Sequence, residues 1–368
     1  MPERFDGLHL AAFSAPALLL VLAILAPGPL TRTAEAQSAE ASKPPKLFSS
    51  DDTFEVVMKA PWNDLQHQKS YQGTYPAQLQ YRASDGSTVT LDMTVARRGV
   101  KRQEFCAFPP IRLRFDKEAV KGTVFRGQKS LKLVTHCKKS SRYDQYYVLE
   151  MLAYRIYNLL TDYSFRVRPL QVTYVDSKSG KDDHPRFAFL IEDDSDLAKR
   201  NDLKKIKIPR IKPSRLDPTV TSLMSVYQYM IGNTDWAALR GPDPKECCHN
   251  IKLIGPEPLG SDQFVVPVPY DFDSSGLVDA RYAAPHEALG IKSVTDRLYR
   301  GYCMHNETLE SARQQVLRQE AAIRGLVANE GRLSSSTKKK AGRYLEDFFE
   351  IAEDPDKFEK NITEHCRR

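Results

Sequence analysis

Side chains that can bind a hard cation and accept a proton cluster in the second half of the chain. They are Asp235 in the segment 233–236 (Asn-Thr-Asp-Trp), Asn250, and the two acids of Asp271-Phe272-Asp273. Strand-like runs over 250–254 and 264–273 flank a turn rich in Gly and Pro, which predicts an antiparallel hairpin. With the turn centred between residues 260 and 261, Asn250 faces Asp271 across the hairpin to within a residue or two.

The predicted hairpin suits a site for Mg²⁺ or Mn²⁺. Directly paired residues have Cβ atoms about 5 Å apart, and Mg²⁺ takes oxygen ligands with only one or two carboxylates. We therefore expect Asn250 and Asp271 to be metal ligands, joined by Asp273, which shares the strand parity of Asp271. Asp235 is expected to accept or orient the proton of an attacking hydroxyl. The plainer interpretation is that these acids serve turns and strand ends.

A predicted strand and the helix after it carry a lysine and a glutamate. In the alternating run 131–137, Lys132 and Val134 lie on one face. The helix has an apolar stripe and a second stripe formed by Tyr147, Glu150, Tyr154 and Tyr157. Glu150 is either a surface residue or a partly buried carboxylate that needs a cation. Lys132 would supply that cation, with Lys129 and Lys138 as nearby alternatives.

The order of these motifs resembles that of the CotH-like family of atypical secreted kinases. The matching segments lie within about residues 110–300 and are 126–127 (Arg-Gly), 131–133 (Leu-Lys-Leu), the helix with Glu150, 189–192 (Phe-Leu-Ile-Glu), 232–236, 249–253 and 269–273. The resemblance implies ATP binding with a divalent metal. It implies Asp235 as the catalytic-loop aspartate, Asn250 and Asp271 as metal ligands, and Lys132 as the phosphate-binding residue paired with Glu150.

Kinase order also implies the fold and the remaining nucleotide contacts. We expect an α+β, two-lobed protein-kinase-like fold, with a strand-rich N-lobe over 51–191 and a mostly helical C-lobe over 192–368 that ends in C-terminal helices. The strand 187–191, which runs into Glu192, would be the hinge between the lobes, and Val134 would touch the nucleotide base. The sequence has no G-x-G-x-x-G loop and no His-Arg-Asp, and Asp-Phe-Asp replaces Asp-Phe-Gly.

These features predict an exported kinase-like phosphotransferase that moves the ATP γ-phosphate to a hydroxyl of a protein or small molecule. Three alternatives remain open: a catalytically inactive binding or scaffold protein, nucleotidyl (AMP) transfer, and a metal-dependent hydrolase that uses Asp235, Asp271 and Asp273. The hydrolase lacks the histidine ligands usual in two-metal phosphatases. We interpret the scattered histidines, His249 among them, as structural or surface residues.

The N-terminus predicts export. Residues 17–26 form an apolar core, and Ala34-Glu35-Ala36 is a cleavage signal, so we expect a signal peptide over 1–36, cleaved after Ala36, and a polar linker over 37–50. An uncleaved anchor is the alternative. The six cysteines predict disulfides in a periplasmic or secreted protein, without indicating which pair. A zinc site at Cys247-Cys248-His249 would lack a second C-x-x-C motif.

Composition limits the class of protein and its partners. Hydrophobic residues make up 41% and charged residues 27% of the 368, which excludes a disordered chain. No second apolar run approaches a membrane span, so we expect no integral span after cleavage. The net charge of +7 favours anionic partners but does not select among nucleotide, polyanion and membrane surface. No nucleic-acid-binding motif is present, so we expect no nucleic acid, and the nucleotide is what the resemblance implies.

Overall fold

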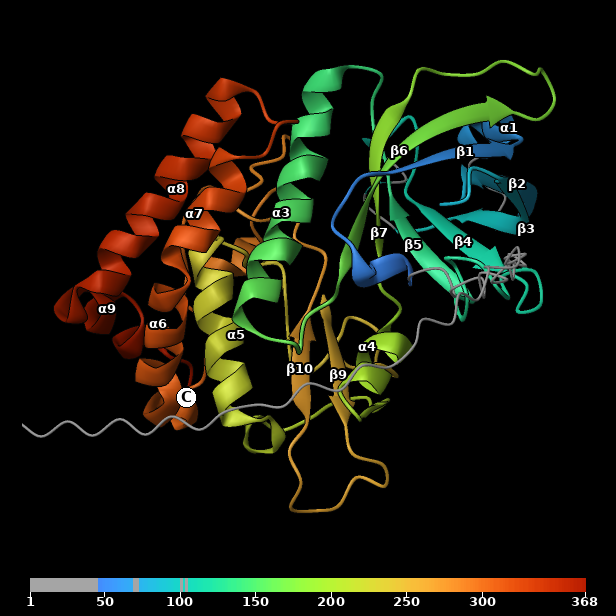
Figure 1. Ribbon diagram of the computed structural model, residues 1–368. Helices are drawn as coiled ribbons and strands as arrows, with labels where there is room; N and C mark the ends of the chain where they lie inside the picture. The colour runs from blue at the N-terminus through green and yellow to red at the C-terminus, as the bar shows by residue number, and fades with distance from the viewer. Residues whose placement is uncertain (1–45, 69–72, 100–101, 103–104) are drawn as a thin grey trace, which may run out of the picture. The chain divides into compact units, whose positions relative to one another are not determined.

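The computed structural model describes residues 46–68, 73–99, 102 and 105–368 (Figure 1). The predicted signal peptide over 1–36 and most of the predicted linker lie outside the described residues. Contacts group the chain from Lys43 to Arg368 into one compact unit. Within the described part of the chain, no helix is long and apolar enough to cross a membrane.

Seven strands form a closed barrel in the order β1-β2-β3-β4-β5-β7-β6. Their bounds are β1 (Phe54–Ala60), β2 (Tyr75–Arg82), β3 (Thr88–Arg97), β4 (Ile111–Phe115), β5 (Ser130–Val134), β6 (Val167–Asp176) and β7 (Arg186–Ile191). Neighbouring strands are antiparallel except β1 and β6, which pair in parallel from Phe54↔Leu170 to Ala60↔Asp176. This parallel pairing closes the sheet on itself.

The expected two-lobed kinase-like fold is therefore wrong. The residues predicted as a strand-rich N-lobe form a closed mixed barrel together with the helix that follows β5, and a separate small sheet with helices makes up the remainder. Alternation of polar and apolar residues indicates which side of a strand is buried. It does not indicate that the first strand will pair with the sixth, and that pairing decides the architecture.

Most of the remaining elements surround a second hydrophobic core, whereas η1 and α1 pack against the core inside the barrel. The helices are α1 (Trp62–His67), α3 (Asp144–Leu160), α4 (Asp194–Arg200), α5 (Pro218–Met230), α6 (Leu309–Arg318), α7 (Glu320–Ala328), α8 (Ser335–Glu353) and α9 (Pro355–Asn361). A small antiparallel sheet has the order β10-β9-β8, with β8 (Lys204–Lys205), β9 (Ile251–Gly255) and β10 (Val266–Pro269). Short 3₁₀ turns are η1 (Leu47–Ser49), η2 (Ser141–Tyr143), η3 (Pro213–Arg215), η4 (Glu287–Leu289), η5 (Cys303–Thr308) and η6 (Thr363–His365).

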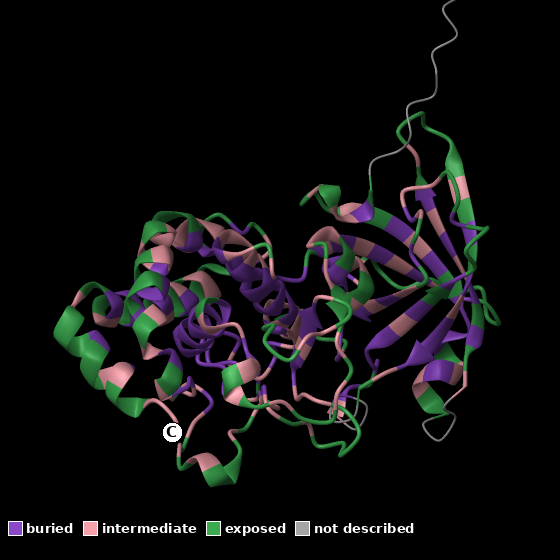
Figure 2. Cartoon of the chain, turned by 90° about the horizontal axis from the view of Figure 1, so that it is seen from below, coloured by how far each residue is buried: buried purple, intermediate pink, exposed green. Residues whose placement is uncertain are grey.

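Along the barrel strands, buried residues alternate with more exposed ones, as the colour bands in Figure 2 show. Successive residues of a strand therefore face opposite sides of the barrel wall. Leu131 and Leu133 of β5 belong to the core inside the barrel. Val134 of β5 and Phe189 of β7 belong to the second core, which also contains α3 and α5. The predicted faces of the lysine-bearing strand are thus confirmed, and Lys132 lies on the outer side of the barrel.

Local sequence signals correctly predicted where α5 begins and where the hairpin forms. Asp217 is the N-cap of α5, and its Oδ1 accepts the Val220 N–H at 2.8 Å. Strands β9 and β10 form the predicted antiparallel hairpin with Ile251 opposite Pro269, so Asn250 lies opposite Tyr270, one residue from the predicted partner. The second strand ends at Pro269 and not at Asp273, because Asp271 adopts a left-handed backbone with φ of 64°.

The six cysteines form three pairs at disulfide distance. They are Cys106–Cys137, Cys247–Cys248 and Cys303–Cys366. The first pair joins the segment before β4 to the end of β5. The last pair joins the start of η5 to the C-terminal end of the chain. Every cysteine of the sequence is therefore paired.

Candidate functional site

The loop after α5 holds Asp235 through a dense set of hydrogen bonds. Asn233 is 1% exposed, and its Oδ1 accepts the Asp235 N–H at 3.0 Å. The Trp236 indole N–H donates to the Asn233 carbonyl at 3.1 Å, and Arg300 donates to the Trp236 carbonyl at 2.6 Å. Because the loop is fixed from both sides, Asp235 projects from a rigid backbone.

Asp235 contacts both residues that open β9. His249 Nε2 lies 2.9 Å from Asp235 Oδ1. The Asn250 amide nitrogen donates to the Asp235 carbonyl at 2.7 Å and lies 3.3 Å from Oδ2. The predicted catalytic aspartate and a predicted metal ligand are thus brought together. Since the amide nitrogen of Asn250 faces Asp235, its oxygen is the atom left to bind a cation.

Asp271 lies at the same end of the hairpin. Tyr270, directly before it, donates its N–H to the Asn250 carbonyl at 3.0 Å, and the Asp271 N–H donates to the Tyr154 hydroxyl at 2.8 Å. No described residue donates a hydrogen bond to the Asp271 carboxylate. Burial and the nearby charge of Asp273 raise the pKa of that carboxyl, against the effect of neighbouring cations. A divalent cation would relieve both effects.

The donor set fits a hard divalent cation held by few protein ligands. One amide oxygen from Asn250 and one carboxylate from Asp271 match the preference of Mg²⁺, which retains waters and binds substrate phosphate. Among the described residues, no group of three or more His, Cys, Asp or Glu side chains is arranged to hold a metal. Water and phosphate oxygens would therefore have to complete the shell.

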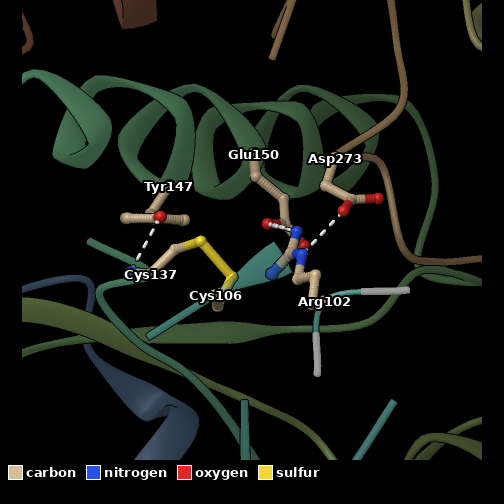
Figure 3. Close-up of a disulfide and its surroundings, with 6 residues drawn as sticks. All are labelled: Arg102, Cys106, Cys137, Tyr147, Glu150 and Asp273. Carbon is tan, nitrogen blue, oxygen red and sulfur yellow. Dashed lines mark hydrogen bonds and ion pairs between the residues drawn. A yellow bond between two sulfur atoms is a disulfide. The ribbon is translucent and has the colours of Figure 1, made fainter. Parts of the chain in front are cut away.

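Asp273 is engaged elsewhere, in a buried triplet of charges. Arg102 Nε donates to Asp273 Oδ2 at 2.6 Å, and Arg102 Nη2 donates to Glu150 Oε2 at 2.6 Å (Figure 3). Glu150 is 1% exposed, so the interpretation as a buried carboxylate that needs a cation is confirmed. In the part of the chain that the structure describes, its cation is Arg102 and not Lys132. Burial raises the pKa of Glu150 to about 7 despite this partner.

The Lys132 ammonium lies over two aromatic rings, those of Tyr270 and Phe165. It lies 4.3 Å from the centre of the Tyr270 ring and 5.8 Å from that of Phe165. Burial and, to a smaller extent, the positive charges of Arg98 and Lys252 lower the pKa of Lys132 to about 7, while Asp194 and Asp271 oppose them. Its predicted role in binding phosphate remains a prediction.

The other two predicted nucleotide contacts are enclosed by protein. Val134 has 0% exposure within the second core. Glu192 is 5% exposed, lies 3.0 Å from Arg200 Nε, and accepts the Arg166 N–H at 3.1 Å. Both residues therefore have structural surroundings, and a contact with nucleotide remains a prediction for each.

Three residues at the site were not predicted. Arg98 and Arg102 lie in a part of the sequence without the hydrophobic periodicity of a helix or a strand, so nothing indicated their position. His249 was interpreted as a structural or surface residue. The expectation that a buried Glu150 needs a cation was correct, but it could not identify which element supplies one. For His249, the signal was its place directly before Asn250.

Comparison with models of known protein families and with curated proteins gave no match to this chain. The resemblance to the CotH-like family thus depends on the quoted residues alone.

Proposed function

We propose that this protein is a metal-dependent phosphotransferase that moves the γ-phosphate of ATP to a hydroxyl group of a protein or small molecule. The observation that carries the proposal is the convergence of Asp235, Asn250 and Asp271 at one end of the β9–β10 hairpin. Those three residues supply an acid on a rigid loop, an amide oxygen and a desolvated carboxylate, which is the set that phosphoryl transfer requires.

In the proposed reaction, the acceptor oxygen attacks the γ-phosphorus, a new P–O bond forms, and the bond to the β-phosphate oxygen breaks to release ADP. Asp235 accepts the hydroxyl proton, and His249, 2.9 Å from its Oδ1, fixes the orientation of that carboxylate. Asn250 and Asp271 would hold Mg²⁺ or Mn²⁺. The bound ion would neutralise charge on the phosphates.

The arrangement of Asp273 argues against the hydrolase alternative. A two-metal hydrolase needs several carboxylates free to bridge its ions. Arg102 holds Asp273 at 2.6 Å, which leaves only Asp235 and Asp271 of the three acids considered for that reaction. Phosphotransfer needs no more than these two. The proposal concerns this chemistry and does not depend on a kinase fold.

We also infer that the protein is exported to an oxidising compartment. Three cysteine pairs at disulfide distance support this, because disulfides persist mainly outside the cytoplasm.

Metal-dependent binding of ATP tests the proposed ligands. Calorimetry on the disulfide-bonded protein should detect ATP binding in the presence of Mg²⁺ or Mn²⁺. Asp271→Asn should weaken it by roughly tenfold or more, because the ion loses its carboxylate. Asp262→Asn removes an exposed carboxylate from the far tip of the same hairpin and should bind ATP normally. Equal binding by the Asp271 variant and wild type would show that the metal assignment is wrong.

The role of Asp235 separates transfer from binding. Asp235→Asn should retain ATP binding but transfer phosphate roughly 10²–10⁴-fold more slowly to any acceptor found, since only the proton acceptor is lost. Radiolabel transfer from γ-labelled ATP measures this rate. Transfer of label from the α-position instead would favour nucleotidyl transfer. ATP binding by wild type without transfer to any extract would favour the scaffold alternative.

A further inference from the structure

We infer that Arg98 and Lys132 form a two-cation site for a chain of phosphate groups, on the outer face of the barrel beside Asp271. The inference deepens the proposed function and rests on it for the identity of the natural ligand. It adds to that function a second phosphate-binding residue, Arg98, and a specificity for ligands with successive phosphates.

Strand register places both side chains on one face. Arg97 pairs with Ile111, which pairs with Leu133, and the Arg98 N–H continues this ladder by donating to the Pro110 carbonyl at 3.0 Å. Ile111 and Leu133 are 0% exposed and belong to the core inside the barrel. The residues of opposite parity therefore point outward.

Two strand spacings and an offset of two residues along the strands separate Arg98 from Lys132, about 12 Å in all. Long side chains can converge over that span: the charge of Arg98 acts on Lys132, and both cations act on Asp271. The outer face that carries them is the face toward Tyr270 and Phe165, since the Lys132 ammonium lies over both rings. The two cations thus border the end of the hairpin that carries Asp271.

Neither cation has an ion-pair partner among the described residues. Arg98 Nε is buried there without a hydrogen bond. Two other enclosed arginines are paired with acids: Arg102 with Glu150 and Asp273, and Arg200 with Glu192. Two neighbouring cations that have lost water are costly unless an anion joins them. The arrangement is therefore one that gains from a multiply charged anion.

The chemistry of the three groups identifies a phosphate chain as the ligand. A guanidinium binds two phosphate oxygens at once, whereas an ammonium acts as a point charge. Asp271 repels a lone anion, but a divalent cation on it attracts a neighbouring phosphate. A ligand that reaches Arg98, Lys132 and such an ion needs successive phosphates, as in a nucleoside triphosphate or inorganic tripolyphosphate. Orthophosphate is too short to contact all of them.

Calorimetry with three probes tests the site on the full disulfide-bonded chain. Tripolyphosphate and ATP should bind in the presence of Mg²⁺, and orthophosphate should bind much more weakly. Arg98→Met should weaken binding of tripolyphosphate and ATP roughly 10- to 100-fold, and Arg98→Lys should lose less. Arg82→Met is the matched control: it removes the same charge from an exposed position at the opposite end of the β2–β3 pair and should bind both probes like wild type.

A second variant guards against misfolding. If Arg98→Met does not fold, judged by its denaturant midpoint, Lys132→Gln on β5 should show the same loss of both ligands. Normal binding of tripolyphosphate and ATP by folded variants at both positions would overturn the inference and leave the proposed function standing. A third outcome is that tripolyphosphate binding depends on Arg98 but ATP binding is unchanged by Asp271→Asn. This outcome would support the two-cation site and refute the proposed metal site. Wild-type protein that binds neither probe would refute both.

Discussion

His136 is a buried imidazole among aromatic rings just beyond the end of β5. It is 6% exposed, and its ring centre lies 4.4 Å from that of Phe108 and 5.3 Å from that of Tyr174. Burial lowers the pKa of His136 to about 4, and the charge of Arg186 contributes, while Asp183 opposes it. The folded protein therefore keeps this ring neutral in mild acid.

His136 should contribute a loss of stability as the pH decreases from about 6.5 to 4, opposed by Glu150, whose raised pKa acts in the other direction. In that window the unfolded state binds a proton at His136 that the folded state excludes, so the free energy of unfolding decreases. The difference reaches about 2 kcal/mol at pH 5. Denaturant titrations at pH 5 and 7.5 should show a smaller difference for His136→Gln than for wild type. His184→Gln, at an exposed position, should retain the full difference. An unchanged pH dependence in the His136 variant would assign the effect to other groups.

The charge triplet of Arg102 illustrates what a single residue can and cannot indicate. The tyrosine stripe around Glu150 left two interpretations open, a surface residue and a partly buried carboxylate, and the structure shows the second. Its partner lies 48 positions before it in the sequence, in a segment without strand or helix periodicity. Only the folded chain makes that pairing visible.

At the scale of elements, the Cys106–Cys137 disulfide ties the arginine-bearing segment to the end of β5. The Cys106 N–H donates to the Arg102 carbonyl at 2.9 Å, and the Cys137 N–H donates to the Tyr147 hydroxyl of α3 at 2.9 Å (Figure 3). The disulfide, α3 and the charge triplet therefore support one another. Loss of the disulfide frees the segment on which Arg102 depends.

Replacing Cys106 and Cys137 together by Ser should lower the free energy of unfolding by about 3–4 kcal/mol, given the 31-residue separation that the disulfide closes. It should also weaken metal-dependent ATP binding, because Arg102 no longer holds Asp273 beside Asp271. In wild type the Cys303–Cys366 disulfide closes a 63-residue separation. The Cys303→Ser/Cys366→Ser variant should therefore lose about 4 kcal/mol of unfolding free energy, with little effect on ATP binding. Denaturant midpoints and calorimetry measure both quantities. Equal loss of binding in the two variants would indicate general destabilisation.

Elements with strong local signals were predictable from the sequence. Asp217 and Pro218 correctly predicted the start of α5, and the Gly/Pro turn predicted the β9–β10 hairpin to within one residue of register. The end of β10 was not predictable, since a left-handed Asp271 depends on its contact with Tyr154 of α3. The candidate site was therefore found through its residue types, and its geometry came from tertiary contacts.

At the scale of the whole described chain, two hydrophobic cores meet across the barrel wall. Leu131 and Leu133 face the core inside, and Val134 faces the core shared with α3 and α5. The alternation of β5 predicted both faces, but no local pattern indicated that the strands close into a ring. Closure depends on pairing between distant strands, which a local pattern does not encode, and for that reason the fold class was wrong.

The parallel pairing of β1 with β6 has a consequence for how the chain is assembled. Phe54 is made early, but its partner Leu170 must be synthesised, and exported if the signal peptide acts as expected, before the ring can close. Until then, both edges of a partly built sheet are open to pairing with other chains. A circular permutant that begins at β6 should therefore acquire its native sheet sooner, because the two partner strands would then be synthesised close together.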